Sequence, residues 1–223
     1  MGTLMIGLRD GAAVSVFKNA VGNISDLCLA VGDKLQPYCN DMVGALKVAL
    51  EDPKVNRDAK PLVISSLGDI AMAIGAAYEP YLQISVMMLM QASQIKGDPD
   101  DDELGAFISE LRLAILEGYS GIIMGLEDGK ILGIFEAQIP AVLQFLDLLA
   151  NESDDDEDVM TAAAALIGDI SRCMAGSPIV QQHMRQPCIF HIIQRAGSLD
   201  DEKARETANY AHAHVQNIVS VTG

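Results

Sequence analysis

The 223-residue chain contains no tryptophan, and aromatic residues make up only 4% of it. Basic residues are also scarce, because 15 Lys and Arg stand against 31 Asp and Glu, giving a formal net charge of −16 at pH 7. A chain this acidic is a poor candidate for binding nucleic acid, since contacts to phosphate depend mostly on Lys and Arg. The charge indicates either a basic partner or simply high solubility.

Paired cysteines and long uninterrupted apolar runs are missing as well. The most apolar run, 131–150, is interrupted by Glu136, Pro140 and Asp147, so we expect no membrane-spanning segment and no membrane partner. Residues 1–8 lack the charged start and apolar core of a signal peptide. The cysteines are too scattered for a disulfide scaffold and predict reduced, mostly buried thiols in an intracellular protein: Cys28, Cys39, Cys173 and Cys188.

Apolar residues are abundant, at 50% of the chain, which is enough to build a sizeable core. They recur at three- and four-residue spacing, and strict alternation is almost absent, which favours helices over strands. Breaks that contain Gly, Asp and Pro separate the periodic segments. The sequence therefore predicts one all-α domain over 1–223, with nine helices near 11–31, 36–50, 58–74, 79–95, 104–127, 137–151, 156–174, 178–195 and 201–220.

Two acidic runs, 98–103 and 154–158, each precede a predicted helix. The first has Asp at alternate positions, as a calcium-binding loop does, but the sixth position holds Glu103 instead of glycine. Its twelfth position holds Ser109 instead of glutamate. Carboxylates at a helix start interact favourably with the helix dipole, so we interpret both runs as solvated helix starts.

Signals for catalysis are weak. The chain has no glycine-rich nucleotide motif, no P-loop, no paired-histidine zinc motif and no Cys-x-x-Cys. His212 and His214 point to different sides of a helix, and nothing completes a metal site around His183 and His191. We therefore expect no enzyme activity, no cofactor and no bound metal.

A short phrase recurs along the chain, as Ser25-Asp26-Leu27, Gly68-Asp69-Ile70 and Gly168-Asp169-Ile170. The aspartates are 43 residues (26 to 69) and 100 residues (69 to 169) apart, and a weaker copy at 117–122 divides the longer interval. A period of about 40–50 residues with two helices in each unit is typical of HEAT or armadillo solenoids. The glycine would let neighbouring helices approach closely. The aspartate is either an ordinary exposed acid or one member of a surface ladder.

These phrases, in this order, resemble the C-terminal HEAT repeats of the importin-β (karyopherin-β) family. The resemblance extends from about Ala20 to about Val215, and its strongest part is 60–75. Further matching phrases are Gln36-Pro37-Tyr38-Cys39-Asn40, Gln91-Ala92-Ser93-Gln94, Leu116-Glu117-Gly118-Tyr119-Ser120-Gly121-Ile122 and Ala208-Asn209-Tyr210-Ala211. The implied fold is an all-α superhelix of four to five helix pairs.

The resemblance implies nuclear protein import rather than chemistry. Members of the family bind the basic N-terminal helix of importin-α, or a basic cargo, along an acidic concave surface, and they contact nucleoporin Phe-Gly repeats. It also implies that Ran-GTP is bound mainly by N-terminal repeats outside this chain, which would then be the C-terminal part of a longer receptor. The implied location is the cytoplasm, the nucleus and the nuclear pore. A structural HEAT scaffold of a phosphatase or cytoskeletal assembly is the alternative.

The second helix of each pair lines the concave surface in this family, which assigns partner-binding residues here. Glu110 and Glu117 are seven residues apart and therefore share one helical face. Tyr210 stands where the family has a tryptophan, and its ring can still contact Lys or Arg. The full predicted set is Asp26, Asp69, Glu110, Glu117, Asp169 and Tyr210.

Eleven methionines, three of them clustered at Met87, Met88 and Met90, have two interpretations. They form either part of the core between repeats or an adaptable apolar groove. If a groove for Phe-Gly repeats exists in this chain, we expect it between adjacent first helices, such as 36–50 and 79–95.

Overall fold

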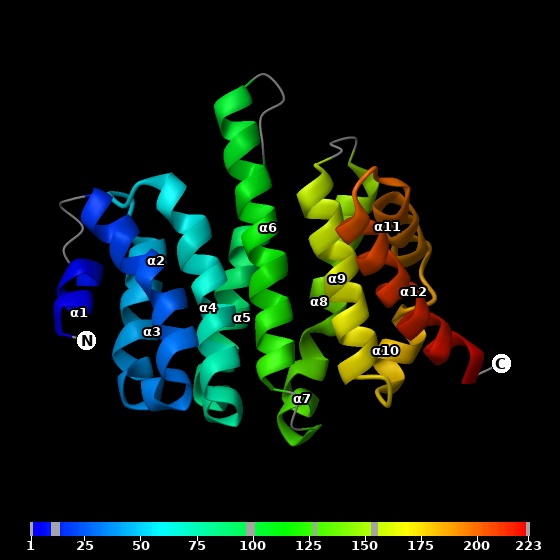
Figure 1. Cartoon of the computed structure of the whole chain (residues 1–223), viewed down its shortest axis with the longest axis horizontal. Helices are drawn as coiled ribbons and strands as arrows, with labels where there is room; N and C mark the ends of the chain where they lie inside the picture. Colours follow the sequence, from blue (N-terminus) through cyan, green and yellow to red (C-terminus); the bar gives the residue numbers. More distant parts are fainter. Residues whose placement is uncertain (1, 10–13, 97–100, 127–128, 153–155, 222–223) are drawn as a thin grey trace. The chain divides into compact units, whose positions relative to one another are not determined.

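A computed structural model describes residues 2–9, 14–96, 101–126, 129–152 and 156–221, and within these ranges the chain forms helices and no strands. The chain divides into two compact units, Met1–Leu126 and Glu127–Gly223 (Figure 1). Each unit is built from antiparallel helix pairs, because apolar residues at helical spacing leave each helix with a face to bury.

The first unit arranges its helices in two layers. Its helices are α1 (Gly2–Arg9), α2 (Val14–Val31), α3 (Gln36–Glu51), α4 (Lys60–Ile74), α5 (Glu79–Ser93) and α6 (Asp102–Gly125). The second helices of the pairs, α2, α4 and α6, lie side by side, with α3 and α5 behind them (Figure 1). Helix α4 is central, since it packs against α2, α3, α5 and α6.

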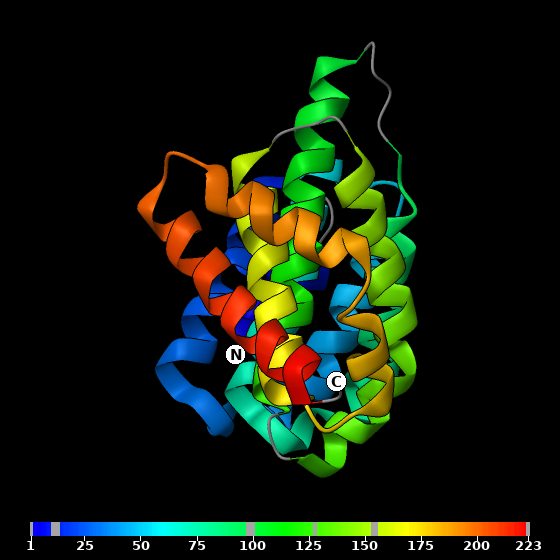
Figure 2. The ribbon, with the colours of Figure 1, turned by 90° about the vertical axis from the view of Figure 1, so that its right-hand side faces the viewer.

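The second unit repeats this arrangement. It contains α7 (Gly129–Phe135), α8 (Ile139–Asn151), α9 (Glu157–Cys173), α10 (Pro178–His183), α11 (Pro187–Ser198) and α12 (Glu202–Val221). Helix α12 lies along α9, as Figure 2 shows in red and yellow, while α11 packs against both of them and against α8.

Two junctions between repeats have the same construction. Helix α2 is followed by Gly32 at φ 55°, and α4 by Gly75 at φ 56°; both values lie in the left-handed region that favours glycine. A short 3-10 turn follows each glycine, and the next helix has Pro37 or Pro80 in its first turn. Each pair of equivalent positions is 43 residues apart, the interval that separates Asp26 from Asp69. The predicted breaks at these glycines are confirmed.

The prediction of one helix over 178–195 is wrong. Helix α10 ends at His183, and α11 begins at Pro187 after an extended Gln186 with φ −69° and ψ 144°. Proline disfavours a helical conformation in the residue before it and has no N–H to donate, so the helix cannot continue through 186–187. With α1 and α7 also unexpected, the described ranges contain twelve α-helices instead of nine.

The interpretation of the acidic runs as helix starts is confirmed for their described residues. The Asp101 carboxylate accepts a hydrogen bond from the Leu104 N–H at 2.9 Å, and Asp156 accepts one from Val159 N–H at 3.1 Å. These carboxylates cap α6 and α9. Asp102 and Glu103 lie in the first turn of α6, and Glu157 and Asp158 in that of α9, while the acids at 98, 100, 154 and 155 lie outside the described residues.

Two stretches, Arg57–Ser93 and Leu132–Asn151, are long and apolar enough to cross a membrane by length and composition alone. About half of each, 56% and 44% of the most apolar window, is buried inside the protein. The first stretch consists of two helices separated at Gly75. The absence of a membrane partner stays a prediction.

Candidate partner-binding surfaces

Glycines determine how closely α4 and α6 approach. A Cβ atom placed on Gly121 would lie 2.6 Å from the Cα of Gly68, and one on Gly68 would lie 3.1 Å from the Cα of Gly118. Gly125 similarly faces the backbone of Ala71. The two helices therefore touch backbone to backbone; a side chain at Gly121 or Gly125 would force the backbones apart, and one at Gly68 would be tightly packed. The sequence interpretation, that the glycine of the repeated phrase permits close approach, is confirmed for Gly68.

The aspartate of the second phrase joins two neighbouring helices. Asp69, on α4, is half-buried, and its Oδ2 accepts a hydrogen bond from the Ser25 hydroxyl on α2. Ser65 and Ser66, which precede Asp69 by four and three residues, both donate to the Leu62 carbonyl. Asp69 thus has a structural role between repeats.

Asp169, in the third phrase, makes an equivalent connection in the second unit. The Tyr210 hydroxyl on α12 donates to Asp169 Oδ1 at 3.0 Å and accepts a hydrogen bond from Arg172 Nε at 3.2 Å. The tyrosine ring covers Gly168 and meets the His214 ring edge-on, with centroids 4.7 Å apart. Burial, and next the nearby Asp169 carboxylate, raise the pKa of Tyr210, so the phenol stays protonated as a donor.

The other predicted site residues are exposed. Asp26 lies on α2, and Glu110 and Glu117 lie on α6. The six predicted residues thus form two classes. Asp69, Asp169 and Tyr210 are half-buried and hydrogen-bonded between helices, while Asp26, Glu110 and Glu117 are turned to solvent. The binding of a partner by either class stays a prediction.

We call the solvent-facing side of α2, α4 and α6 the second-helix face. Every position of this face is exposed or half-exposed, and its members recur at the three-, four- and seven-residue intervals of one helical side. It contains acids but no Lys or Arg: Asn19, Gly22, Asp26 and Leu29 on α2; Leu62, Ser65, Asp69 and Met72 on α4; Glu110, Leu113, Glu117 and Met124 on α6.

The basic residues of α2 and α4 are engaged elsewhere. The Lys18 ammonium lies 3.9 Å from the Asp58 carboxylate, and Lys60 Nζ donates to the Leu50 carbonyl at 3.2 Å. The second-helix face is therefore of one sign, which raises the local concentration of an oppositely charged ligand.

A cavity of about 130 Å³ lies in the groove between α3 and α5, where a site for Phe-Gly repeats was expected. Its apolar lining comes from both first helices and from α4 and α6 behind them. Of the three clustered methionines, Met88 is buried and lines this cavity, whereas Met87 and Met90 are exposed. The rim carries two cations that were not singled out from the sequence. The lining includes Leu50, Ile64, Met88, Ala92, Ile95, Phe107 and Leu111, and the rim Lys47, Glu51, Lys60 and Gln91.

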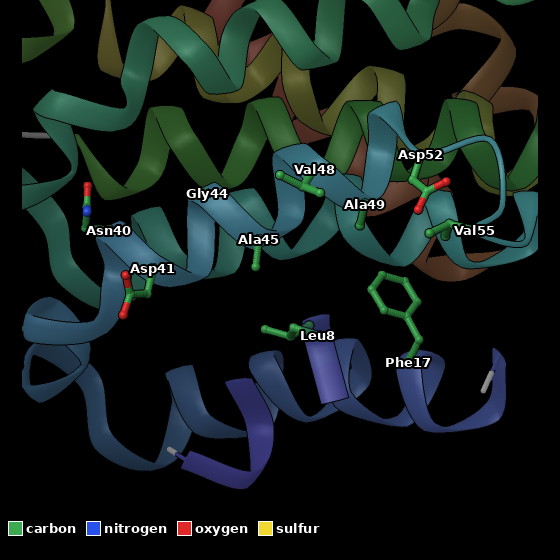
Figure 3. Close-up of a pocket in the computed structure, with 10 residues that line it drawn as sticks. All are labelled: Leu8, Phe17, Asn40, Asp41, Gly44, Ala45, Val48, Ala49, Asp52 and Val55. Carbon is green, nitrogen blue, oxygen red and sulfur yellow. The ribbon is translucent and has the colours of Figure 1, made fainter. Parts of the chain in front are cut away.

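A larger cavity, of about 340 Å³, lies between α3 and the start of the chain (Figure 3). Leu8 and Phe17 point into it from α1 and α2, and Ala45 and Ala49 of α3 face them (Figure 3). Among the described residues that line it, Asp41 and Asp52 are the charged ones, and the others offer mainly apolar contact. No sequence motif indicated this cavity.

A third cavity, of about 400 Å³, lies between α8, α10 and α11, and places Asp147, His183 and Cys188 together. Burial, and next the Asp147 carboxylate, raise the pKa of the Cys188 thiol, which keeps it protonated and unreactive. His183 Nδ1 is 2.8 Å from Gln186 Nε2, and the Cys188 thiol donates to Gln186 Oε1 at 3.8 Å. No group of three or more His, Cys, Asp or Glu suited to a metal ion occurs in the part of the chain that the structure describes.

Comparison with known proteins identifies the family. A family model described as "Importin subunit beta-1-like, TPR repeats" matches residues 1–197. The chain belongs to this importin-β family. Importin subunit beta-1 of Arabidopsis thaliana is 31% identical over 222 residues, which is 98% of this chain and 25% of that protein. The chain thus spans about a quarter of the length of this relative.

Solved structures of importin-β agree with the family. A structure of Kap95p with RanGDP, in which Kap95p binding makes the switch loops of RanGDP adopt the GTP-bound conformation, matches at a TM-score of 0.87 and 26% identity. It covers 97% of this chain and 25% of that one. A Kap95:Nup1 complex matches at a TM-score of 0.85 and 27% identity, with the same coverage. The predicted fold class, an all-α HEAT-repeat superhelix of the importin-β type, is confirmed.

Proposed function

We propose that this importin-β segment is part of a nuclear transport receptor and that its second-helix face binds the basic N-terminal helix of importin-α, or a basic cargo. The observation that supports the proposal is that this face carries negative charge only. Asp26, Glu110 and Glu117 are exposed on it, and none of its positions holds a cation. The receptor would act in the cytoplasm, the nucleus and the nuclear pore.

Binding to this face would be the sum of many weak contacts. A solvent-exposed ion pair contributes about 0–1 kcal/mol, so three exposed acids alone give modest affinity. Exposed charges are also screened, since the Debye length falls from about 30 Å at 0.01 M salt to about 8 Å at 0.15 M. We therefore expect affinity for a basic helix to fall steeply as salt is added.

A second partner fits the groove between the first helices. We propose that the cavity between α3 and α5 accepts the phenylalanine of nucleoporin Phe-Gly repeats. An apolar cavity of about 150 Å³ holds a benzene molecule, and the cavity here is of about 130 Å³ with an apolar floor. The Nup1 complex of Kap95 supports a nucleoporin partner for the family.

Ran is the third proposed partner. The structure of Kap95p with RanGDP supports Ran binding in the family. We propose that Ran-GTP is contacted mainly through receptor repeats other than those described here, so that this segment serves adaptor and nucleoporin binding.

The adaptor proposal is tested by titrating the 223-residue chain with a basic helical peptide at increasing salt. We expect Asp26→Asn and Glu117→Gln each to weaken binding by about two- to fivefold at low salt, as for a surface ion pair. Asp41→Asn is the matched control, because Asp41 is an exposed acid on α3, in the other layer. Affinity that does not change with salt, or that Asp41→Asn lowers equally, would refute the electrostatic proposal. Complete absence of binding would favour the scaffold alternative.

The nucleoporin proposal is tested by comparing a Phe-Gly peptide with its Ala-Gly counterpart, using NMR chemical shifts. Shifts are expected in α3 and α5, around Ile95, which lines the cavity and is 45% exposed. Ile95→Ser is expected to weaken binding, and Met87→Ser, on α5 but outside the cavity lining, is its control. Shifts confined to other helices would contradict the proposed site.

A further inference from the structure

Four large apolar side chains are exposed on the second-helix face: Leu62, which is 40% exposed, and one near the C-terminal end of each of the three helices. Leu29 on α2 is 83% exposed, Met72 on α4 is 52% exposed, and Met124 on α6 is 40% exposed. Sequence reasoning selected only the acids of these helices and missed the apolar residues near them.

Leu29, Met72 and Met124 lie at one level on three neighbouring helices. Leu29 and Met72 are 43 residues apart and so occupy equivalent repeat positions, and the Ser25–Asp69 hydrogen bond fixes the register of α2 against α4. On the other side of α4, a Cβ atom on Gly125 would lie 2.8 Å from the Met72 nitrogen, which places Met124 beside Met72. Leu29, Met72 and Met124 therefore form a row across the helices, which we call the apolar row.

Each member of the apolar row has an acid on the same side of its own helix. Asp26 precedes Leu29 by three residues, Asp69 precedes Met72 by three, and Glu117 precedes Met124 by seven. Residues three and seven apart share a helical side, so each acid lies on the same side of its helix as the apolar row, about 4.5 Å from it along α2 and α4 and about 10.5 Å along α6. A ligand that covers the row and these acids needs an apolar stripe flanked by cations.

We infer that the apolar row binds the apolar stripe of an amphipathic basic helix that lies across α2, α4 and α6. Packed helices are about 8–10 Å apart, and seven residues of a helix span about 10.5 Å. Apolar ligand residues at positions i, i+7 and i+14 therefore match Leu29, Met72 and Met124, and Lys or Arg on the flank of the stripe faces Asp26 and Glu117. This inference rests on the proposed function and specifies its ligand.

Two peptides of equal charge test the inference on the 223-residue chain. One is a basic helix with leucine at i, i+7 and i+14, and the other has alanine at the same three positions. We expect the leucine peptide to bind at least about tenfold more tightly, because burial of three leucines adds apolar contact that alanine cannot make. We expect Leu29→Gln and Met72→Gln to remove most of this preference, with a circular dichroism spectrum like that of the parent chain.

Matched controls come from the other layer of the first unit. Met87→Gln changes an exposed methionine on α5, and Val48→Thr changes an exposed apolar residue on α3; both are expected to leave the leucine preference unchanged. If both peptides bind equally, the apolar row has no role and the inference fails, while the electrostatic proposal stands. If neither peptide binds, both fail. If Leu29→Gln abolishes self-association of the chain but leaves peptide binding unchanged, the row pairs copies of the chain and the inference also fails.

Discussion

Replacement of glycine with alanine is predicted to have opposite effects at two positions of the first unit, one inside the tight contact between α4 and α6 and one outside it. Gly121→Ala places a Cβ atom 2.6 Å from the Cα of Gly68 and 2.8 Å from its carbonyl carbon, both of which are backbone atoms of α4. Carbon atoms prefer a separation of about 3.5–4.0 Å, and a backbone cannot rotate away as a flexible side chain can. The two helices must therefore separate by about 1 Å.

The expected cost follows from two opposing contributions. Replacing glycine with alanine inside a helix favours the folded state by about 0.5–1 kcal/mol. Overpacking a tight contact costs about 1–3 kcal/mol, and a gap of 0.5–1 Å removes about a quarter to a half of the dispersion energy of the facing atoms. We expect Gly121→Ala to lower the free energy of unfolding by about 2 kcal/mol.

The matched control is Gly44→Ala on α3, where an added Cβ would meet no atom within 4 Å. There the helix-propensity gain is unopposed, so the free energy of unfolding should rise by about 0.5–1 kcal/mol. Urea unfolding followed by circular dichroism measures both changes, and hydrogen exchange of amides in α4 and α6 locates the first one. If Gly121→Ala proves as stable as Gly44→Ala, the backbone contact between α4 and α6 does not limit their approach.

Three further predictions concern hydroxyl and thiol groups. Tyr210→Phe removes the donor to Asp169 and the acceptor for Arg172. It should lower the free energy of unfolding of the second unit by about 0.5–1.5 kcal/mol, as measured by urea unfolding. Tyr38→Phe, at an exposed tyrosine of α3, is the control, and an equal effect there would contradict a stabilising role of the Tyr210–Asp169 hydrogen bond. Burial raises the pKa of Cys28 to about 12 and that of Cys39 to about 11, so near pH 8 a thiol reagent should label the half-exposed Cys173 first. In the unfolded chain the two thiols ionise above their ordinary pKa of about 9, whereas in the folded protein Cys28 and Cys39 stay protonated up to about pH 11–12. Between these values the unfolded state binds fewer protons than the folded state, so the free energy of unfolding should fall as pH rises from about 9 to about 12. Rapid labelling of Cys28 in the folded protein, or stability unchanged over this range, would contradict the burial.

Local sequence signals predicted most of the fold. The 43-residue interval identified equivalent helices, and Gly32 and Gly75 ended α2 and α4 at the expected breaks because their left-handed backbone favours glycine. The break between α10 and α11 was missed because apolar residues keep helical spacing across 184–186. Pro187 was the available signal, since proline disfavours a helical residue before it.

The site was less predictable than the fold. Periodicity placed Asp69 and Asp169 on helix surfaces correctly, but their partners, Ser25 and Tyr210, are 44 and 41 residues away in the sequence. Such pairs depend on the register between packed helices, which a single sequence does not specify. Exposure of Leu29 likewise depends on which neighbours cover α2, and apolar periodicity alone would place it in the core.

The glycines between α4 and α6 have a mechanical consequence. Helices joined backbone to backbone have almost no side-chain layer to deform, whereas α2 and α4 meet through side chains such as Ser25 and Asp69. We expect α4 and α6 to move together as a rigid body and α2 to change its orientation relative to them. Any adjustment of the first unit to ligands of different diameter would then be concentrated at the interface between α2 and α4.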